Sequence, residues 1–509
     1  PLVRRSYCLP ASMTDVTALI AQLPFELAQE FGVVPVADEG SAIAVATAPH
    51  MTVASLSAVR QRLGRPLRAQ AVSADEFKAR LTSAYSGVAR SQSATPAPAV
   101  SGGEVAPSHE QDLLASTTLA DDAPAVRIVS ELLRDALASA ASDIHLDATE
   151  RGGRVRFRVD GVLADVRDTD AATHAALAAR CKVMASLDIA ERRLPQDGRL
   201  QVTIAGHRVD VRVATLPTQH GERVVLRLLD TSAARLNLAA LGLQPRVLDA
   251  LRGAVRMPHG LVLVTGPTGS GKTTTLYAAV SELDRERLNV VSVEDPVEYA
   301  LDRVAQTQVN PRIDLSFARA LRSILRHDPD VIIVGEIRDR ETAEIAIQAS
   351  LTGHLVLASL HTNTAGAAIT RLTDMGVEPY LIASSLRGVL AQRLVRRLCP
   401  SCRESYAVSP ENATLLKTHG ISAEAGLGRL WAAEGCPACS ASGYRGRMGL
   451  YRWLPATAAI AQAIHARKAD TEIERIAESA GWPTLAADAA PALADGSTSL
   501  SEVLRVVTL

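Results

Sequence analysis

The segment Gly266-Pro267-Thr268-Gly269-Ser270-Gly271-Lys272-Thr273 decides the fold class of this chain. Its glycines let the backbone wrap around phosphate oxygens, the lysine adds a positive charge, and the last hydroxyl is a ligand for Mg²⁺. The run Leu261–Thr265 before it predicts a buried strand, and Lys272–Leu283 predicts a helix whose first amides face the phosphates. Strand, loop and helix in this order predict a P-loop for ATP and Mg²⁺, held by residues 266–274, and argue against a glycine-rich turn with a surface lysine.

Three further apolar runs continue a pattern of short strands separated by helical segments. They are Val290–Val293, Val331–Val334 and Leu355–Ser359. Apolar strands that alternate with helices are typical of a parallel sheet covered by helices. We therefore predict an α/β nucleotide-binding domain.

Acidic and histidine side chains follow these three runs. Glu336 follows the second run, where P-loop enzymes place metal-binding and water-activating acids, so it is our candidate general base. Glu294 and Glu298 follow the first run and are candidates to orient Mg²⁺ or water, because ligands bind at the carboxyl ends of such strands. His361 follows the third run, near the expected γ-phosphate. A strand-end glutamate or histidine on its own is more often structural, but the position of these residues after the P-loop favours a functional role.

The whole chain has the composition of a globular protein. At about 100–200 residues per domain, 509 residues predict several compact units. The 54 basic and 55 acidic residues give a formal charge of −1, which removes the bulk electrostatic argument for binding to nucleic acid. No apolar stretch approaches the roughly 18 residues that indicate a membrane span, so we expect a cytoplasmic protein.

Composition and periodicity divide the chain further. A small unit with a strand at Ala42–Ala46 comes first, and a stretch rich in Ser, Ala, Pro and Gly then predicts a flexible linker. The next unit has an α+β pattern with turns expected at Asp160-Gly161 and Asp197-Gly198. The predicted boundaries are 1–87 for the first domain, 88–122 for the linker, 123–234 for the α+β domain, 235–398 for the ATPase domain, 399–443 for a cysteine-bearing subdomain and 444–509 for a helical C-terminal subdomain.

Two Cys-x-x-Cys pairs, Cys399 with Cys402 and Cys436 with Cys439, follow the ATPase domain. Each pair has the spacing that lets two thiolates bind one tetrahedral Zn²⁺, and four such ligands close a structural site. A redox dithiol or a disulfide is the alternative, but neither pair lies in a thioredoxin-like pattern. The gap of 33 residues between the pairs favours an inserted lobe over a nucleic-acid finger.

Taken together, these segments resemble the secretion ATPase superfamily, in which a P-loop, an Asp box, a variant Walker B strand and a His box follow one another. The Asp box corresponds to Ser292–Glu298 and the His box to Gly353–His361, and the resemblance spans about Ala123 to Leu454. One departure is that the Walker B strand ends in Glu336 instead of the usual aspartate, so Mg²⁺ is expected to be held partly through water.

Three flanking segments look most like the general secretion pathway E family, the cytoplasmic ATPases of type II secretion. They are Leu194–Arg199, Gly221–Asp230 and Phe317–Arg326. This resemblance implies a RecA-like ATPase core behind an α+β domain, and a homo-hexameric ring with ATP between the two domains of one subunit. It also implies arginines that reach the phosphates from flanking domains, and the matching positions here are Arg212, Arg227, Arg322 and Arg326. The alternative for these arginines is pairing with nearby acids.

The same resemblance implies a role and partners. ATP hydrolysis would drive assembly of a pseudopilus that exports proteins across the outer membrane. Residues 1–87 would dock on the cytoplasmic part of an inner-membrane platform protein, and the tetracysteine insertion would bind Zn²⁺. The basic residues Arg393, Arg396, Arg397 and Arg403 would face a membrane rich in acidic phospholipid, although ordinary solvation also explains them.

Three other functions remain open at this point. A type IV pilus extension ATPase shares every catalytic motif and the zinc insertion. A DNA-dependent recombination or translocation ATPase is compatible with the core alone, although the near-neutral charge argues against it. A zinc-bearing adaptor that binds ATP without turnover is the non-catalytic alternative.

Overall fold

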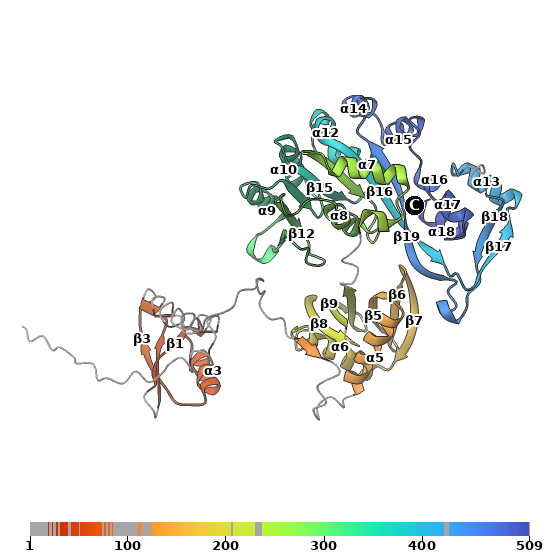
Figure 1. Cartoon of the computed structure of the whole chain (residues 1–509). Helices are drawn as coiled ribbons and strands as arrows, with labels where there is room; N and C mark the ends of the chain where they lie inside the picture. Colours follow the sequence, from red (N-terminus) through yellow and green to blue (C-terminus); the bar gives the residue numbers. More distant parts are fainter. Residues whose placement is uncertain are drawn as a thin grey trace, which may run out of the picture. The chain divides into compact units, whose positions relative to one another are not determined.

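The computed structural model describes residues 31–38, 42–49, 51–73, 110–112, 124–204, 207–229, 237–421 and 427–507, with a few further positions between 19 and 84 (Figure 1). The chain divides into two compact units, Pro1–Ala106 and Pro107–Leu509. None of the described helices is long and apolar enough to cross a membrane.

The first unit is a small α/β domain. Its strands β1 (Val33–Asp38), β2 (Ile43–Thr47) and β3 (Leu67–Ala71) lie in that order, with β1 antiparallel and β3 parallel to β2. The helix α3 (Val53–Leu63) makes the crossover between β2 and β3. Thr52 caps its first turn by accepting the Ser55 N–H, and Gly64 ends it at φ 66°.

The α+β domain opens the second unit and contains a seven-stranded sheet in the order β4-β8-β9-β10-β5-β6-β7. Helices α5 (Pro124–Ala138) and α6 (Ala171–Met184) pack on it around an apolar core. The strands are β4 (Glu110–Asp112), β5 (Ala141–Thr149), β6 (Gly152–Val159), β7 (Val162–Thr169), β8 (Gln196–Ile204), β9 (His207–Thr218) and β10 (Gly221–Leu229). Strand β4 lies within the predicted linker, and the rest of residues 88–122 is outside the described residues.

One of the two turns expected in this domain is wrong. Asp160-Gly161 does join β6 to β7, but Asp197-Gly198 lies inside strand β8. A Cβ on Gly198 would lie 2.7 Å from the carbonyl oxygen of Ala185, at the end of α6. The glycine is therefore needed because helix α6 and strand β8 approach closely. An Asp-Gly pair in a sequence does not by itself distinguish such a close approach from a turn.

The ATPase domain has a second seven-stranded sheet in the order β13-β12-β14-β15-β11-β16-β19. All neighbouring pairs are parallel except β16 with β19, which confirms the predicted parallel α/β sheet. Its strands are β11 (Gly260–Thr265), β12 (Val290–Glu294), β13 (Val304–Gln308), β14 (Val331–Val334), β15 (Leu355–Leu360), β16 (Leu386–Leu398) and β19 (Tyr444–Pro455). The covering helices include α7 (Pro245–Val255), α8 (Lys272–Val280), α9 (Phe317–Ile324), α10 (Arg340–Leu351), α11 (Ala365–Asp374) and α12 (Pro379–Ser385).

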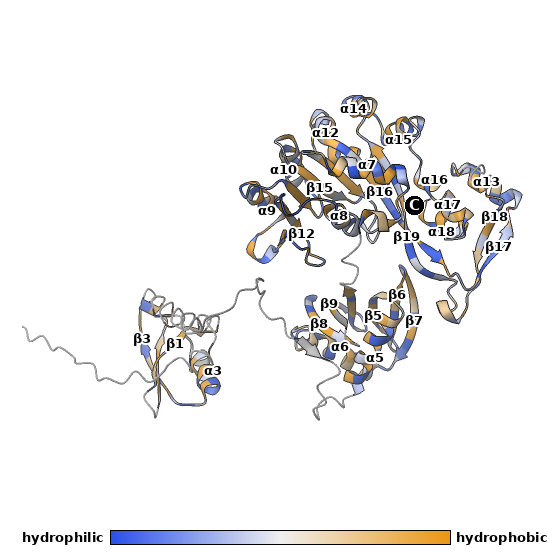
Figure 2. Ribbon diagram, in the orientation of Figure 1, coloured by the Kyte–Doolittle hydropathy of each residue, from blue (hydrophilic) through white to orange (hydrophobic). Residues whose placement is uncertain are grey.

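Both faces of this sheet are buried, which explains the continuous apolar run of its central strand β11. Leu261 and Leu263 belong to the core on the side of α9 and α10, whereas Val262 and Val264 belong to the core beneath α7 and α8. Successive side chains of a strand point to opposite faces, so a strand covered on both faces has no alternation of apolar and solvent-exposed polar residues. Apolar residues accordingly concentrate along the central strands in Figure 2.

The cysteine-bearing lobe is inserted between the last two strands of the sheet. The strand β16 continues to Leu398, beyond its pairing with β11, and β19 returns antiparallel to it from Tyr444. The predicted boundary at 444 thus falls on the first residue of a strand that belongs to the ATPase sheet. The lobe contains β17 (Arg403–Ala407), α13 (Pro410–Thr418) and β18 (Arg429–Ala433), and the chain then forms α14 (Ala458–His465), α15 (Asp470–Ser479), α16 (Leu485–Asp488), α17 (Ala490–Ala494) and α18 (Leu500–Val507).

Candidate nucleotide site and tetracysteine centre

The P-loop joins β11 to α8 at the carboxyl edge of the parallel sheet. Gly269 and Gly271 have φ values of 78° and 87°, which residues with a Cβ atom rarely adopt, and Gly271 leads directly into α8. A Cβ on Gly266 would lie 2.4 Å from the carbonyl oxygen of Gln392 on β16. The loop therefore directs its backbone, without side-chain obstruction, towards the space in front of the helix. Thr273 and Thr274 are half-buried in the first turn of α8.

Lys272 is folded back onto its own loop. Its Nζ donates to the carbonyl oxygens of Gly266 (2.9 Å) and Pro267 (3.2 Å), and it lies 3.3 Å from Nδ1 of His361. Burial lowers the pKa of Lys272 to about 8, and the charge of Arg393 adds to this effect while that of Glu336 opposes it. A buried ammonium group whose partners are neutral carbonyl oxygens and a histidine ring, with no carboxylate among them, fits the binding of a phosphate.

Glu336 follows β14 and is held from both sides. Its Oε1 lies 3.2 Å from His361 Nε2, and its Oε2 accepts the Nε–H of Arg338 at 2.8 Å. Arg338 also donates to Asp295 Oδ2 at 3.0 Å. Burial and the charge of Lys272 lower the pKa of His361, which favours a neutral imidazole. The structure therefore brings Lys272, His361 and Glu336 into one chain of contacts at the ends of β11, β15 and β14.

The two carboxylates of the Asp box have different surroundings. Glu294 is buried and accepts hydrogen bonds from Ser292 Oγ (2.5 Å), from Gln306 Nε2 (3.1 Å) and from the hydroxyl of Tyr277 on α8. Glu298 forms an ion pair with Arg212 at 3.0 Å. In this structure Glu294 thus fastens α8 to β12, and Glu298 contacts the α+β domain.

Each of the four predicted arginines contacts a neighbour outside the P-loop. Arg212 also donates to the Val297 carbonyl at 3.1 Å, and burial lowers its pKa. Arg227 pairs with Asp143 at 2.9 Å, Arg322 pairs with Glu341, and Arg326 donates to the Arg322 carbonyl at 2.9 Å. Within one chain the arginines therefore have local acidic or carbonyl partners. The side chains of Arg227 and Arg322 are still more than half exposed.

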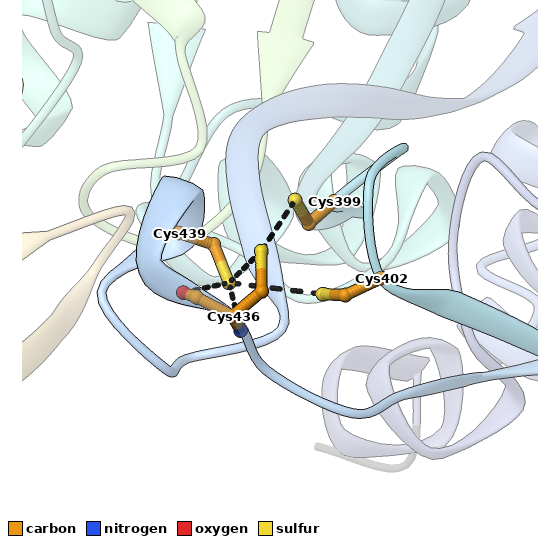
Figure 3. Close-up of side chains that lie close together, drawn as sticks. All are labelled: Cys399, Cys402, Cys436 and Cys439. Atoms are coloured by element: carbon orange, nitrogen blue, oxygen red, sulfur yellow. Dashed lines mark hydrogen bonds between the residues drawn. The ribbon is translucent and has the colours of Figure 1, made fainter.

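The four cysteines converge from two short turns (Figure 3). The sulfur atoms of Cys399 and Cys436 are 3.9 Å apart, those of Cys402 and Cys439 are 3.8 Å apart, and those of Cys436 and Cys439 are 3.7 Å apart. A tetrahedron of sulfurs at about 2.3 Å from zinc has edges of about 3.8 Å, so the donor set fits Zn²⁺. Cys439 Sγ also accepts the backbone N–H groups of Cys436 and Gly443, both at 3.2 Å, as suits a thiolate ligand.

Comparisons with known proteins give the family of this chain. A family model described as "Type II/IV secretion system protein" matches residues 118–505, and a model for a domain of "GSPII protein E" matches residues 22–85. Type II secretion system protein E of Pseudomonas aeruginosa is 46% identical over 505 residues, covering 98% of this chain and 99% of that protein. The chain belongs to the type II secretion ATPase E family. Type II secretion system ATPase E of Vibrio cholerae is 51% identical to it over 396 residues, covering 78% of this chain and 77% of that protein.

Solved structures show the same fold as this type II secretion ATPase. The Legionella pneumophila ATPase DotB superposes with a TM-score of 0.56 at 20% identity, covering 75% of this chain and 95% of that one. The pilus retraction motor PilT, solved with bound ADP, gives a TM-score of 0.50 at 25% identity over 74% of this chain and 96% of its own.

Sequence reasoning missed two residues of this ATPase that contact the site. Arg338 holds Glu336 and lies only two residues beyond it, so an arginine directly after the strand-end acid was the available signal. Gln392 is buried against the P-loop, and no local signal singled it out, because β16 also contains four arginines.

The prediction that four basic residues between positions 393 and 403 face lipid is partly wrong. Arg393 is 5% exposed and donates to the Asn363 carbonyl at 2.9 Å, behind the His box. Arg396 pairs with Glu502 and lies over the ring of Tyr444, and the Arg403 guanidinium lies over the ring of Trp431. Arg397 is exposed. Arginines that look alike in sequence are thus divided between buried, half-buried and exposed positions.

Proposed function

We propose that this ATPase is a hexameric motor that powers pseudopilus assembly and protein export across the outer membrane in type II secretion. The observation that carries the proposal is the convergence of Lys272, His361 and Glu336 in front of the P-loop. The relatives of this chain are named as type II secretion system proteins, and we take protein secretion as the process that the motor drives from those names.

The chemistry assigned to the site follows from its donors and acceptors. Lys272 exchanges its loop carbonyls for phosphate oxygens of ATP, and the hydroxyl of Thr273 would hold Mg²⁺. Mg·ATP supplies the phosphoryl group that is transferred to water. Glu336 accepts the proton of that water, while Arg338 and neutral His361 fix the orientation of the carboxylate.

The arginines act at the boundaries between domains. The exposed guanidinium groups of Arg227 and Arg322 leave their acids and bind the γ-phosphate when neighbouring domains close, and Arg212 and Arg326 assist them. An arginine placed in this way accelerates hydrolysis by roughly 10³–10⁵-fold in other P-loop enzymes. When Arg212 moves, the Glu298 carboxylate loses its ion-pair partner and would be available to orient Mg²⁺ or water.

The remaining parts connect the motor to the membrane. The four cysteines would hold Zn²⁺ as a closed structural site that stabilises the lobe and takes no part in hydrolysis. Residues 1–87 dock on the cytoplasmic domain of an inner-membrane platform protein, which places the motor in the cytoplasm at the membrane surface. Acidic phospholipid contributes through Arg397, which is exposed.

The experiment is complementation of a strain that lacks its type II secretion ATPase, with secreted protein measured in the medium. The full chain should restore secretion, while Lys272→Ala and Glu336→Gln should not, at equal protein levels. Retrieval of the tagged full chain from membranes identifies the platform protein. Copurification with a pilus platform and restored pili without restored secretion would instead assign the chain as a type IV pilus extension ATPase.

A further inference from the structure

Gln392 on β16 contacts the P-loop and the helix that follows it. Its side chain is 1% exposed. Nε2 donates to the carbonyl oxygen of Ser270 at 2.6 Å, and Oε1 accepts the hydroxyl of Thr275 at 2.8 Å. One amide group therefore binds the P-loop backbone and the first turn of α8 at the same time.

Close packing leaves this amide little freedom. Thr275 is also 1% exposed, and a Cβ added to Gly271 would lie 3.3 Å from Gln392 Nε2. The strand β16 pairs with β11, the strand that leads into the P-loop, with Thr265 opposite Ala391. The amide thus closes a loop of contacts formed by β11, the P-loop, α8 and β16.

The next residue of the strand points the other way, towards the other loop of the site. Arg393 donates to the backbone carbonyl and the side-chain oxygen of Asn363, at 2.9 and 3.2 Å, two residues beyond His361. Successive strand residues face opposite sides, so adjacent positions of β16 reach the P-loop and the His-box loop.

We propose that Gln392 is a positioning residue that keeps the P-loop amides oriented for phosphate by holding the Ser270 carbonyl and Thr275. Phosphate binding at a helix N-terminus depends on several amides pointing at one place, so a loop free to rotate about Ser270 loses affinity. The inference rests on the proposed nucleotide site, and it adds a residue that contacts no part of the nucleotide.

The test compares three variants of the full chain. Gln392→Leu keeps the size of the side chain and removes both hydrogen bonds, and Thr275→Val removes one of them from the other side. Thr498→Val is the matched control, because the buried Thr498 hydroxyl donates to the carbonyl of Arg396 on the same strand, at 2.8 Å. The measurements are the Kd of Mg·ADP, kcat and KM for ATP, the thermal midpoint, and amide hydrogen exchange.

The Kd of Mg·ADP should rise roughly 10-fold in Gln392→Leu and about threefold in Thr275→Val, as expected when buried partners lose their hydrogen bonds. KM should rise with it more than kcat falls, and exchange should accelerate in residues 266–275. Thr498→Val should lower the thermal midpoint without changing Kd. If Gln392→Leu does not fold, Thr275→Val decides the question.

A Kd within twofold of wild type and unchanged exchange in residues 266–275 would overturn the assignment and leave Gln392 as a packing residue. Wild-type protein that does not bind Mg·ADP at all would overturn the nucleotide site itself, so the two failures are distinguishable.

Discussion

The Lys272 ammonium group is buried and bonds to carbonyls of its own loop, and burial lowers its pKa to about 8. The charged form is present below that pH and is lost as the pH rises through it. The affinity of the free protein for Mg·ADP should therefore fall above pH 8, approaching tenfold per pH unit. Fluorescence titration from pH 7 to 9.5 measures this Kd of Mg·ADP.

The control is Lys272→Arg, whose side chain stays charged over this range, so its affinity for Mg·ADP should not change with pH. Equal wild-type affinity at both limits would contradict the lowered pKa.

Loss of the Arg338 side chain should slow ATP turnover while leaving nucleotide binding almost unchanged. Arg338→Ala releases Glu336 Oε2 and Asp295, so the carboxylate is no longer held towards the attacking water. We expect kcat to fall about 10- to 100-fold while the Kd of Mg·ADP changes little. Arg340→Ala is the control, because that exposed arginine pairs only locally with Glu344, at 2.7 Å. An equal loss of kcat in both variants would remove the positioning role from Arg338.

At this scale the sequence predicted residues with a strong local motif. Lys272, Glu336 and His361 could be named because each follows an apolar strand, and the parallel sheet brings strand ends together. Gln392 could not be named, because its role depends on β16 lying next to β11, and those strands are more than a hundred residues apart in the chain. The acidic partners of Arg227 and Arg322, Asp143 and Glu341, could not be named either, because each pair joins two different elements of the fold.

At the scale of elements, the end of β16 is fastened to the C-terminal helix α18. The Glu502 carboxylate accepts hydrogen bonds from Arg396 (2.8 Å) and Arg505 (2.6 Å). Burial alone would raise the pKa of Glu502, but these guanidinium groups outweigh it and lower the pKa to about 2. The carboxylate therefore stabilises the fold above its unfolded pKa of about 4.5, and that contribution is lost as the pH falls towards 2.

Glu502→Gln should consequently lower the thermal midpoint by roughly 5 °C at neutral pH. The difference between the two proteins should shrink when calorimetry is repeated at about pH 3.5, where the unfolded carboxyl group is protonated. Glu404→Gln, an exposed glutamate on β17, is the matched control and should change little. A difference that does not depend on pH would contradict this account of α18.

The elements themselves were more predictable than their connections. Strands of the ATPase sheet were visible as apolar runs, and their burial on both faces explains why. The return of β19 to that sheet was not visible, since its pairing with β16 spans the whole cysteine lobe. The misread Asp197-Gly198 pair shows the same limit, because close approach to Ala185 is a tertiary contact.

At the scale of the whole molecule, the cysteine lobe should depend on its metal. Cys439→Ser should reduce bound zinc from about one per chain to none, because the metal needs all four thiolates to close its site. Elemental analysis measures the metal, and limited proteolysis should then cut within residues 399–443. Cys181→Ser, a buried cysteine of α6, should retain zinc. Purified wild-type protein without zinc would contradict the assignment.

ATP hydrolysis by the purified full chain tests the central claim most directly. With Mg²⁺ present, wild-type protein should release phosphate, while Glu336→Gln should bind ATP with near wild-type affinity and release phosphate at least about 100-fold more slowly. Glu344→Gln changes a half-buried glutamate on α10 outside the site, and this variant should hydrolyse ATP at the wild-type rate. Wild-type protein without hydrolysis, or Glu336→Gln with full activity, would contradict a motor whose turnover depends on Glu336.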